Sequence, residues 1–146
     1  MTVLNKMGPK TELVVPGYLK NLAKIEAFVT QAAVQAGLNE QAIFAVQMAV
    51  DEACTNIIRH AYCGEGKGPI RLICDCQPEG LQITIFDQGD SFDPAQVPDL
   101  NTQAPLEERQ AGGMGLFFVN NLMDEVQFSF DTPGSNQLVL FKRREP

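Results

Sequence analysis

The sequence predicts a two-layer α/β sandwich, in which a mixed, mainly antiparallel β-sheet carries helices on one face. Three observations lead to this class. Several short segments alternate polar and apolar residues as strands do, and two longer segments repeat apolar residues at the helical period. The chain of 146 residues, 45% hydrophobic and 20% charged, has the length and composition of one globular domain, so we expect residues 1–146 to share a single core.

The N-terminal part is expected to supply a strand and then a helix. Residues 11–15 alternate, are rich in branched side chains and end at a Pro-Gly pair, which predicts a strand. Between residues 18 and 36 apolar side chains recur at the helical period, and Gly37 follows as a stop signal. This pattern predicts an amphipathic helix.

A second helix is expected from Asn39, whose side chain can cap it, to about Tyr62. Apolar residues, Phe44 among them, occur on more than one side of this segment, so we expect the helix to be deeply buried. Glu52 and Asn56 are four residues apart and therefore project from one face of it. Because polar groups on a buried helix need partners, this pair is a candidate site.

The second half of the chain is expected to supply most of the sheet. Two alternating segments joined by a short turn predict an antiparallel hairpin, and two further segments predict the closing strands. The expected strands are 70–76, 81–86, 125–130 and 136–143, and a helix is expected at 114–123. Residues 88–113 show no period, and a structureless loop of this length inside a compact domain is usually functional.

The composition excludes several classes of partner. The formal charge is −7 and the basic residues are scattered apart from 142–144, so direct nucleic-acid binding is not expected, whereas a basic protein surface would be attracted. No apolar run reaches the ~20 residues of a membrane-spanning helix, and we see no signal peptide. The cysteines show no metal-ligand spacing, so we expect buried, reduced thiols in a cytoplasmic protein. These are Cys54, Cys63, Cys74 and Cys76.

Asp87 follows the apolar run of a predicted strand. A carboxylate at such a strand end can accept a hydrogen bond from the exocyclic amine of adenine, and Gly89 would let the backbone approach the ring plane without a side-chain clash. The alternative is an ordinary surface turn, because Asp and Gly dominate turns. Taken alone, this segment favours the turn.

A glycine cluster, Gly112-Gly113-Met114-Gly115, opens the helix expected at 114–123. The free N–H groups and the dipole at a helix N-terminus make an anion site that suits phosphates. A flexible loop end that caps a helix is the alternative. The cluster lacks the Lys and Ser or Thr of a P-loop and does not follow the first strand of a βαβ unit, which disfavours both a P-loop and a Rossmann domain.

Glu52 and Asn56 have side chains suited to a general base and a magnesium ligand, because Mg²⁺ takes oxygen donors and keeps waters and substrate phosphates as its other ligands. The alternative is a pair that is solvated or bonded to neighbours such as Arg59. Together with an acceptor for a base edge and amides for phosphates, this pair suits a purine nucleoside triphosphate.

These segments together resemble a known family. Residues 52–56 resemble the N-box of the Bergerat-fold ATPases, the group of gyrase, heat-shock chaperones, histidine kinases and mismatch-repair proteins, and residues 87–94 and 112–115 resemble their two glycine boxes. More narrowly, residues 51–62, the Phe-Asp-Pro ending of the first glycine box and residues 112–126 resemble the bacterial anti-sigma factor serine/threonine kinases. The resemblance covers almost the whole chain.

The resemblance implies the Bergerat ATP-binding fold, with ATP and Mg²⁺ as cofactors. Glu52 would be the base that activates the acceptor serine, Asn56 would hold Mg²⁺, and Asp87 would read adenine. A lid would span about 94–112. The other residues expected to contact the nucleotide are Gly89, Phe92, Arg109, Gly112, Gly113, Met114, Gly115 and Leu116.

The implied function is ATP-dependent phosphorylation of a serine or threonine on a small anti-anti-sigma partner of the STAS type, coupled to sequestration of a sigma factor. Family members often dimerise, so a homodimer is a further expectation. The alternative is a nucleotide-gated protein-binding switch without kinase activity, which would keep Asp87 and the glycines but could lose the base. The presence of Glu52 favours the kinase, because phosphoryl transfer needs few reactive groups beyond correct positioning.

Overall fold

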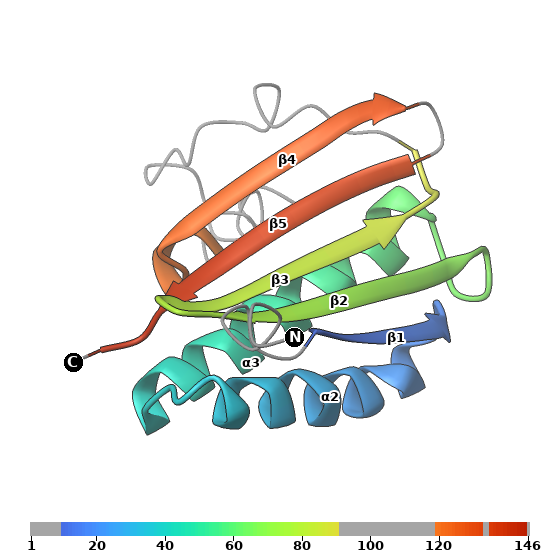
Figure 1. Ribbon diagram of the computed structural model, residues 1–146. Helices are drawn as coiled ribbons and strands as arrows, with labels where there is room; N and C mark the ends of the chain where they lie inside the picture. The colour runs from blue at the N-terminus through green and yellow to red at the C-terminus, as the bar shows by residue number, and fades with distance from the viewer. Residues whose placement is uncertain (1–9, 91–118, 133–134, 146) are drawn as a thin grey trace, which may run out of the picture.

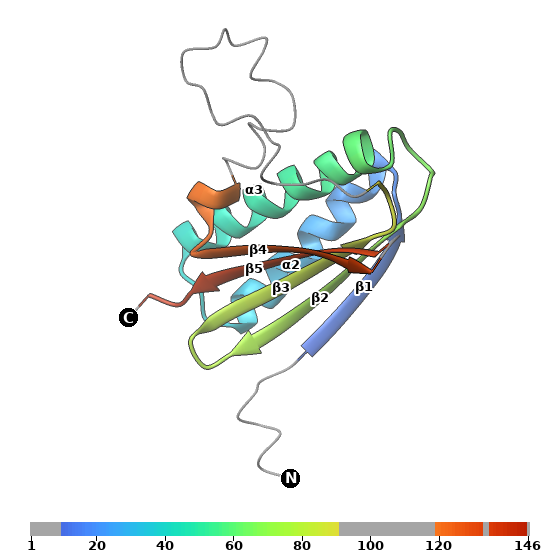
Figure 2. The same cartoon turned by 90° about the horizontal axis from the view of Figure 1, so that it is seen from above.

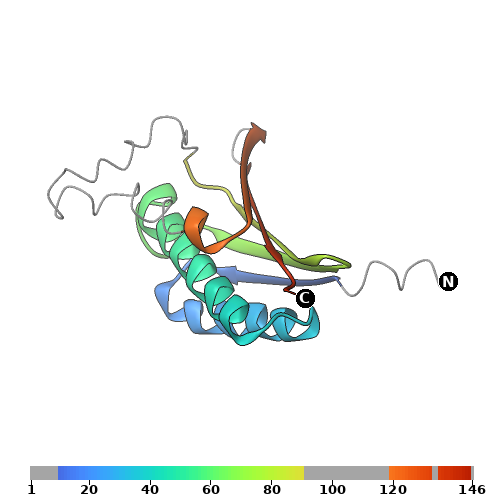
Figure 3. The same cartoon turned by 90° about the vertical axis from the view of Figure 1, so that its left-hand side faces the viewer.

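The protein folds into two layers, a five-stranded sheet and a pair of helices that cover one face of it (Figures 1 and 3). The computed structural model describes residues 10–90, 119–132 and 135–145. The strand order is β1-β2-β3-β5-β4, and each of these pairings is antiparallel. The strands are β1 Lys10–Pro16, β2 Pro69–Gln77, β3 Gly80–Asp87, β4 Glu125–Thr132 and β5 Ser135–Arg143. The predicted α/β sandwich with helices on one face is confirmed.

The helical layer consists of α2 (Leu22–Gln35) and α3 (Glu40–Asn56), which lie side by side against the sheet (Figure 2). A 3₁₀ turn, η1 (Leu19–Asn21), precedes α2, and a π-helical turn, η2 (Ile57–Ala61), continues α3. None of the helices in the described ranges is both long and apolar enough to cross a membrane.

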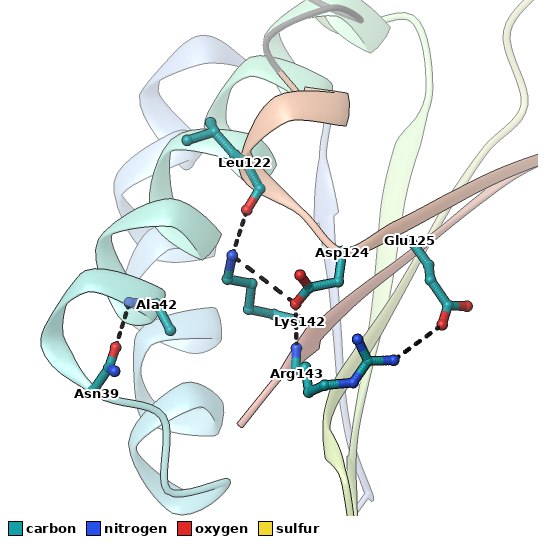
Figure 4. Close-up of polar contacts among 7 residues, drawn as sticks. All are labelled: Asn39, Ala42, Leu122, Asp124, Glu125, Lys142 and Arg143. Atoms are coloured by element: carbon teal, nitrogen blue, oxygen red, sulfur yellow. Dashed lines mark hydrogen bonds and ion pairs between the residues drawn. The ribbon is translucent and has the colours of Figure 1, made fainter. Parts of the chain in front are cut away.

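The boundaries of the two helices follow local chemistry. Gly37 has a φ of 80°, a left-handed conformation that ends α2 at little cost because glycine has no Cβ. Asn39 caps α3 as predicted, since its side-chain oxygen accepts a hydrogen bond of 2.8 Å from the backbone N–H of Ala42 (Figure 4). The chain therefore reverses direction between the helices within a few residues.

The core lies between the layers, and only one face of α3 contributes to it. That face consists mostly of small side chains, which let the helix lie close to the sheet. The expectation that α3 is buried on more than one side was wrong, because Phe44 is 60% exposed. A two-layer fold offers each helix one apolar surface, and Phe44 lies on the opposite side of the helix from that surface. The buried residues of α3 are Ala42, Ala45, Val46, Ala49, Val50, Ala53 and Cys54.

All four cysteines are free, and three of them lie in this core. Burial raises the pKa of the Cys54 thiol above its ordinary range and that of Cys74 to about 12. Cys76 is also buried, with its pKa raised by burial. Cys63 is exposed, which corrects the expectation of four buried thiols: it follows the π-turn and lies outside the interface between the layers.

Residues 119–122 are helical and join the core through Val119, which is fully buried. Lys142 of β5 attaches this turn to the sheet, because its Nζ donates a hydrogen bond of 2.8 Å to the carbonyl of Leu122 and lies 4.0 Å from a carboxylate oxygen of Asp124 (Figure 4). The backbone N–H of Arg143 donates to the same carboxylate at 2.6 Å. Residues 119–124 are thereby tied to β5.

Candidate nucleotide site

Asp87 ends β3 in a buried environment and is only 7% exposed. Its Oδ1 accepts two hydrogen bonds, one of 2.9 Å from the backbone N–H of Gly89 and one of 2.8 Å from the side chain of Asn136 on β5. Its Oδ2 accepts none from the described residues. The chain does turn here, since Gln88 and Asp90 are exposed, but the Asp87 carboxylate itself is buried.

Two opposing effects act on the charge of Asp87. Burial is the larger and raises the pKa of the carboxyl above its ordinary value, while the hydrogen bonds from Asn136 and Gly89 favour the ionised form and lower it. A partly desolvated carboxylate with one oxygen left free can bind a ligand N–H strongly, because the surroundings screen that interaction little.

Gly89 is required by close packing against the end of the π-turn. A Cβ built on Gly89 would lie 2.5 Å from the carbonyl oxygen of Ala61, and the neighbouring Asp90 N–H donates to that same oxygen at 2.8 Å. The sequence had suggested that this glycine admits a ligand ring. In the structure the atoms nearest to that Cβ position belong to Ala61, so Gly89 also fixes the loop after β3 against the helical layer.

The π-turn η2 makes this contact possible. It begins directly after Asn56, and its wider ladder is closed by a hydrogen bond of 2.8 Å from the Tyr62 N–H to the Ile57 carbonyl. Single π-turns within or after α-helices occur frequently at functional sites. Here the turn brings the Ala61 carbonyl to the loop after Asp87.

Tyr62 adds a second link between the layers. Its hydroxyl donates a hydrogen bond of 2.5 Å to the Pro69 carbonyl and accepts one of 2.8 Å from the backbone N–H of Gln88. Burial raises the pKa of this phenol, the bond from Gln88 lowers it, and the charge of Asp87 raises it. The ring also fills the space next to Gly68, where a Cβ would lie 2.6 Å from it. The loop after β3 is thus held by Tyr62, Ala61 and Asn136.

Glu52 and Asn56 lie one turn apart on α3, at the edge of its buried face, and both are half-buried. The Glu52 carboxylate makes no hydrogen bond or ion pair with the described residues. The Nδ2 atom of Asn56 is buried without a hydrogen-bond partner in the described part of the chain. Buried unpaired polar atoms are uncommon and often mark functional positions.

The end of β3 lies near the end of α3, because the N–H of Asp90 donates to the carbonyl of Ala61 in the turn that follows Asn56. The charges of Asp51 and Asp87 both add to the raised pKa of Cys54, which lies between Glu52 and Asn56 in the sequence. Asp87 and Gly89 therefore lie near the C-terminal end of α3. The other expected nucleotide contacts fall outside the described residues: Phe92, Arg109, Gly112, Gly113, Met114, Gly115 and Leu116.

Three residues of this region were not predicted as part of the site, namely Ala61, Tyr62 and Asn136. A signal for Asn136 was present in the sequence. It alternates with Leu138 and Leu140, whose side chains face the core, so a strand at 136–143 directs Asn136 to the buried side. A polar residue in that position needs partners. The roles of Ala61 and Tyr62 depend on the π-turn, which has no comparable sequence signal.

In this fold an antiparallel sheet carries helices on one face. A buried carboxylate at the end of a strand lies beside a helix that carries Glu and Asn. This is the arrangement of a nucleotide-binding ATPase domain. The chain belongs to the histidine kinase-like ATPase domain family, whose model matches residues 15–142. The family resemblance carried by the motifs is thereby confirmed.

More particular relatives are serine-protein kinases. The chain is 30% identical over 140 residues to Serine-protein kinase RsbW of Bacillus cereus (strain AH187), covering 93% of this chain and 87% of that protein. The figures are the same for Serine-protein kinase RsbW of Bacillus anthracis (strain A0248). The fold is also similar to the crystal structure of the RsbU and RsbW domains of Rv1364c from Mycobacterium tuberculosis, with a TM-score of 0.66 at 15% identity. That match covers 92% of this chain and 32% of the larger one, and it supports the fold.

Proposed function

We propose that this chain is an ATP-dependent serine/threonine protein kinase that acts as an anti-sigma factor. It would transfer the γ-phosphoryl group of ATP to a serine or threonine of a small STAS-type anti-anti-sigma protein, and it would sequester a sigma factor. Identity of 30% to serine-protein kinases over most of the chain supports this function. The observation that carries it is the Asp87 carboxylate, buried at a strand end and held by two donors while its second oxygen has no partner in the described structure.

Asp87 is the proposed adenine reader. Its Oδ2 accepts a hydrogen bond from the exocyclic amine of adenine. Guanine would present a carbonyl oxygen at the same place. An acceptor facing an acceptor leaves a buried group unpaired, which costs more than the loss of an average hydrogen bond. The site therefore prefers ATP to GTP.

Asn56 is the proposed protein ligand of Mg²⁺. The fit rests on its amide: Nδ2 is buried and unpaired, while Oδ1 accepts no hydrogen bond from the described residues and supplies the hard oxygen that Mg²⁺ prefers. When bound, the ion neutralises charge on the phosphates. The chain itself contributes the orientation of this amide at the last turn of α3.

Glu52 is the proposed general base, and its carboxylate is free of partners in the described structure. In the transfer step the hydroxyl oxygen of the partner's serine or threonine attacks the γ-phosphorus as its proton passes to Glu52. The bond between the γ-phosphorus and the β–γ bridging oxygen breaks, and ADP leaves. Positioned carboxylates of this kind contribute about 10²–10⁴-fold to a rate.

The phosphates are assigned to the glycine-rich segment from its motif. Gly112, Gly113, Met114, Gly115 and Leu116 would offer backbone N–H groups, and Gly89 and Phe92 belong to the first glycine box. Arg109 would approach the γ-phosphate from the lid at about 94–112. We assign residues 1–146 to one domain and propose that it forms a homodimer. We also propose that the protein is cytoplasmic, which its four free thiols support.

The experiment is a transfer assay with purified protein, Mg²⁺, ATP labelled at the γ-phosphate and a panel of STAS-domain proteins from the same genome. Label should appear on a partner's serine or threonine, and Glu52→Gln, which keeps shape but cannot accept the proton, serves as the matched control. Parallel calorimetry with ADP separates the alternatives. Binding of ADP without any transfer would favour the nucleotide-gated switch, and the absence of binding would overturn the nucleotide site itself.

A further inference from the structure

Asn136 occupies an unusual position at the start of β5. It pairs directly opposite Asp87 of β3 in the sheet register and is only 5% exposed. Its Nδ2 lies 2.8 Å from Asp87 Oδ1, 3.0 Å from the Gly89 carbonyl oxygen and 3.4 Å from the Asp90 carbonyl oxygen. One amide group thus contacts both the carboxylate and the loop that follows it.

These contacts restrict the orientation of the Asp87 carboxylate. Two donors, Asn136 Nδ2 and the Gly89 N–H, converge on Oδ1, so the carboxyl group cannot rotate without losing both bonds. Rotation is the main freedom of an aspartate at χ2, which is a broad torsion. With Oδ1 held, Oδ2 keeps one direction.

The two donors are not equivalent. The Gly89 N–H belongs to the loop and moves with it, whereas Asn136 belongs to β5, which pairs with both β3 and β4. Asn136 also holds the Gly89 carbonyl, so the position of the loop donor itself depends on it. Asn136 is therefore the donor that ties the Asp87 carboxylate to β5.

We propose that Asn136 is the positioning residue that aims Asp87 Oδ2 at the exocyclic amine of the nucleobase, and that it thereby sets the preference for a 6-amino purine. This inference rests on the proposed nucleotide site and adds to it the residue that determines base selectivity. Asn136 acts through Asp87 and does not itself touch the amine.

The test compares two ligands that differ only in that amine: ADP and the 5′-diphosphate of purine riboside. Calorimetry gives the ratio of their dissociation constants for the wild type, Asn136→Ala and Gln137→Ala. Gln137 is the next residue of the same strand, with its side chain on the other face of the sheet, and is the matched control. The wild type and Gln137→Ala should prefer ADP by about tenfold or more, which corresponds to one hydrogen bond to a charged group.

In Asn136→Ala the ratio should fall toward one, mainly through weaker binding of ADP. A residue needed only for folding would weaken both ligands equally, so an unchanged ratio in a folded variant would overturn the assignment to Asn136 alone. If the alanine variant does not fold, Asn136→Ser keeps a polar group there but is one atom too short for these contacts, and it should lower the ratio likewise. If the wild type binds neither ligand, the proposed nucleotide site is wrong and this inference with it.

Discussion

Asp87 on the sheet and the pair Glu52 and Asn56 on α3 differ in how far the protein satisfies their polar atoms. The carboxylate of Asp87 is fixed by a backbone and a side-chain donor. Glu52 has no partner in the described structure, and Asn56 leaves a buried amide nitrogen unpaired. The difference matches two tasks: a group that reads a rigid base gains from being held in advance, whereas groups that handle a metal ion and a proton must be free to meet them.

Asp87 and Asn56 also differ in the free energy that their polar groups cost the free protein. The Asp87 carboxylate is already fixed in the folded protein. It therefore loses little conformational entropy when a ligand binds. The unpaired buried Nδ2 of Asn56 instead costs stability in the free protein. Under the proposed function, the end of β3 would supply selectivity and α3 would supply the groups for phosphoryl transfer.

The largest effect should come from the unsatisfied region. Glu52→Ala should lower phosphoryl transfer by about 10²–10⁴-fold because the general base is lost, while ADP affinity stays close to that of the wild type. Transfer is measured with labelled ATP and a cognate partner, and binding by calorimetry. Asn56→Ala is the contrasting variant: it should lose the dependence of affinity on Mg²⁺. Wild-type transfer by Glu52→Ala would mean that the base lies elsewhere.

At the satisfied region, Asp87→Asn should weaken ADP binding by about 10- to 100-fold, the cost of turning an acceptor into a donor opposite the base amine. The remaining oxygen of Asn can still accept from Asn136 and Gly89, so the fold should persist. Calorimetry with ADP measures the affinity. An unchanged affinity would remove the adenine role of Asp87.

Asp87→Asn should also change how the free energy of unfolding depends on pH, because it removes the titrating carboxyl group. Because burial raises that pKa in the folded state, the wild type is stabilised by protonation at low pH and loses this contribution as the pH rises from about 4 through the raised value. Asp87→Asn has no such dependence. The free energy of unfolding of the variant relative to the wild type should therefore increase with pH over this range, as urea titrations at several pH values can measure.

A smaller effect is expected at the contact between the two regions. Gly89→Ala places a Cβ against the Ala61 backbone, where 2.5 Å is too short for any contact, so the loop or the π-turn must shift. We expect a loss of about 1–3 kcal/mol in the free energy of unfolding, the usual cost of overpacking. Gln88→Ala, at an exposed neighbour whose backbone N–H is retained, is the control. Equal urea midpoints for the two variants would contradict the close packing of Gly89.

The smallest expected effect is a difference between the exposed and the buried cysteines in their rate of reaction with a thiol reagent. Cys63 should react with a thiol reagent at once, whereas the three buried cysteines should react only on unfolding, because burial keeps their thiols protonated and covered. The mass of unreduced protein should correspond to four free thiols. A mass lower by two or four protons would contradict the reduced state.

The sequence predicted most of the fold because its signals are local. Alternation located the strands to within a residue or two, and Asn39 capped α3 as expected. Burial was harder to predict, since an apolar pattern does not say how many layers will cover a helix, and Phe44 remained exposed. The sequence motifs also selected Asp87, Gly89, Glu52 and Asn56 for the candidate site.

The contacts that hold this region could not be predicted in the same way. Asn136 is 49 residues from Asp87, and its role follows from the register of β3 against β5. Ala61 and Tyr62 reach the loop after β3 only because the helix widens into a π-turn after Asn56. Such long-range contacts depend on how the elements pack together, which residue spacing does not encode.

The proposed adenine-reading role of the fixed acceptor at the end of β3 is tested most directly by calorimetric titration of the wild-type protein with ADP and with GDP in the presence of Mg²⁺. We predict that ADP binds at least about tenfold more tightly than GDP, because guanine presents a carbonyl to the free oxygen of Asp87. Equal affinities for the two nucleotides would contradict the account.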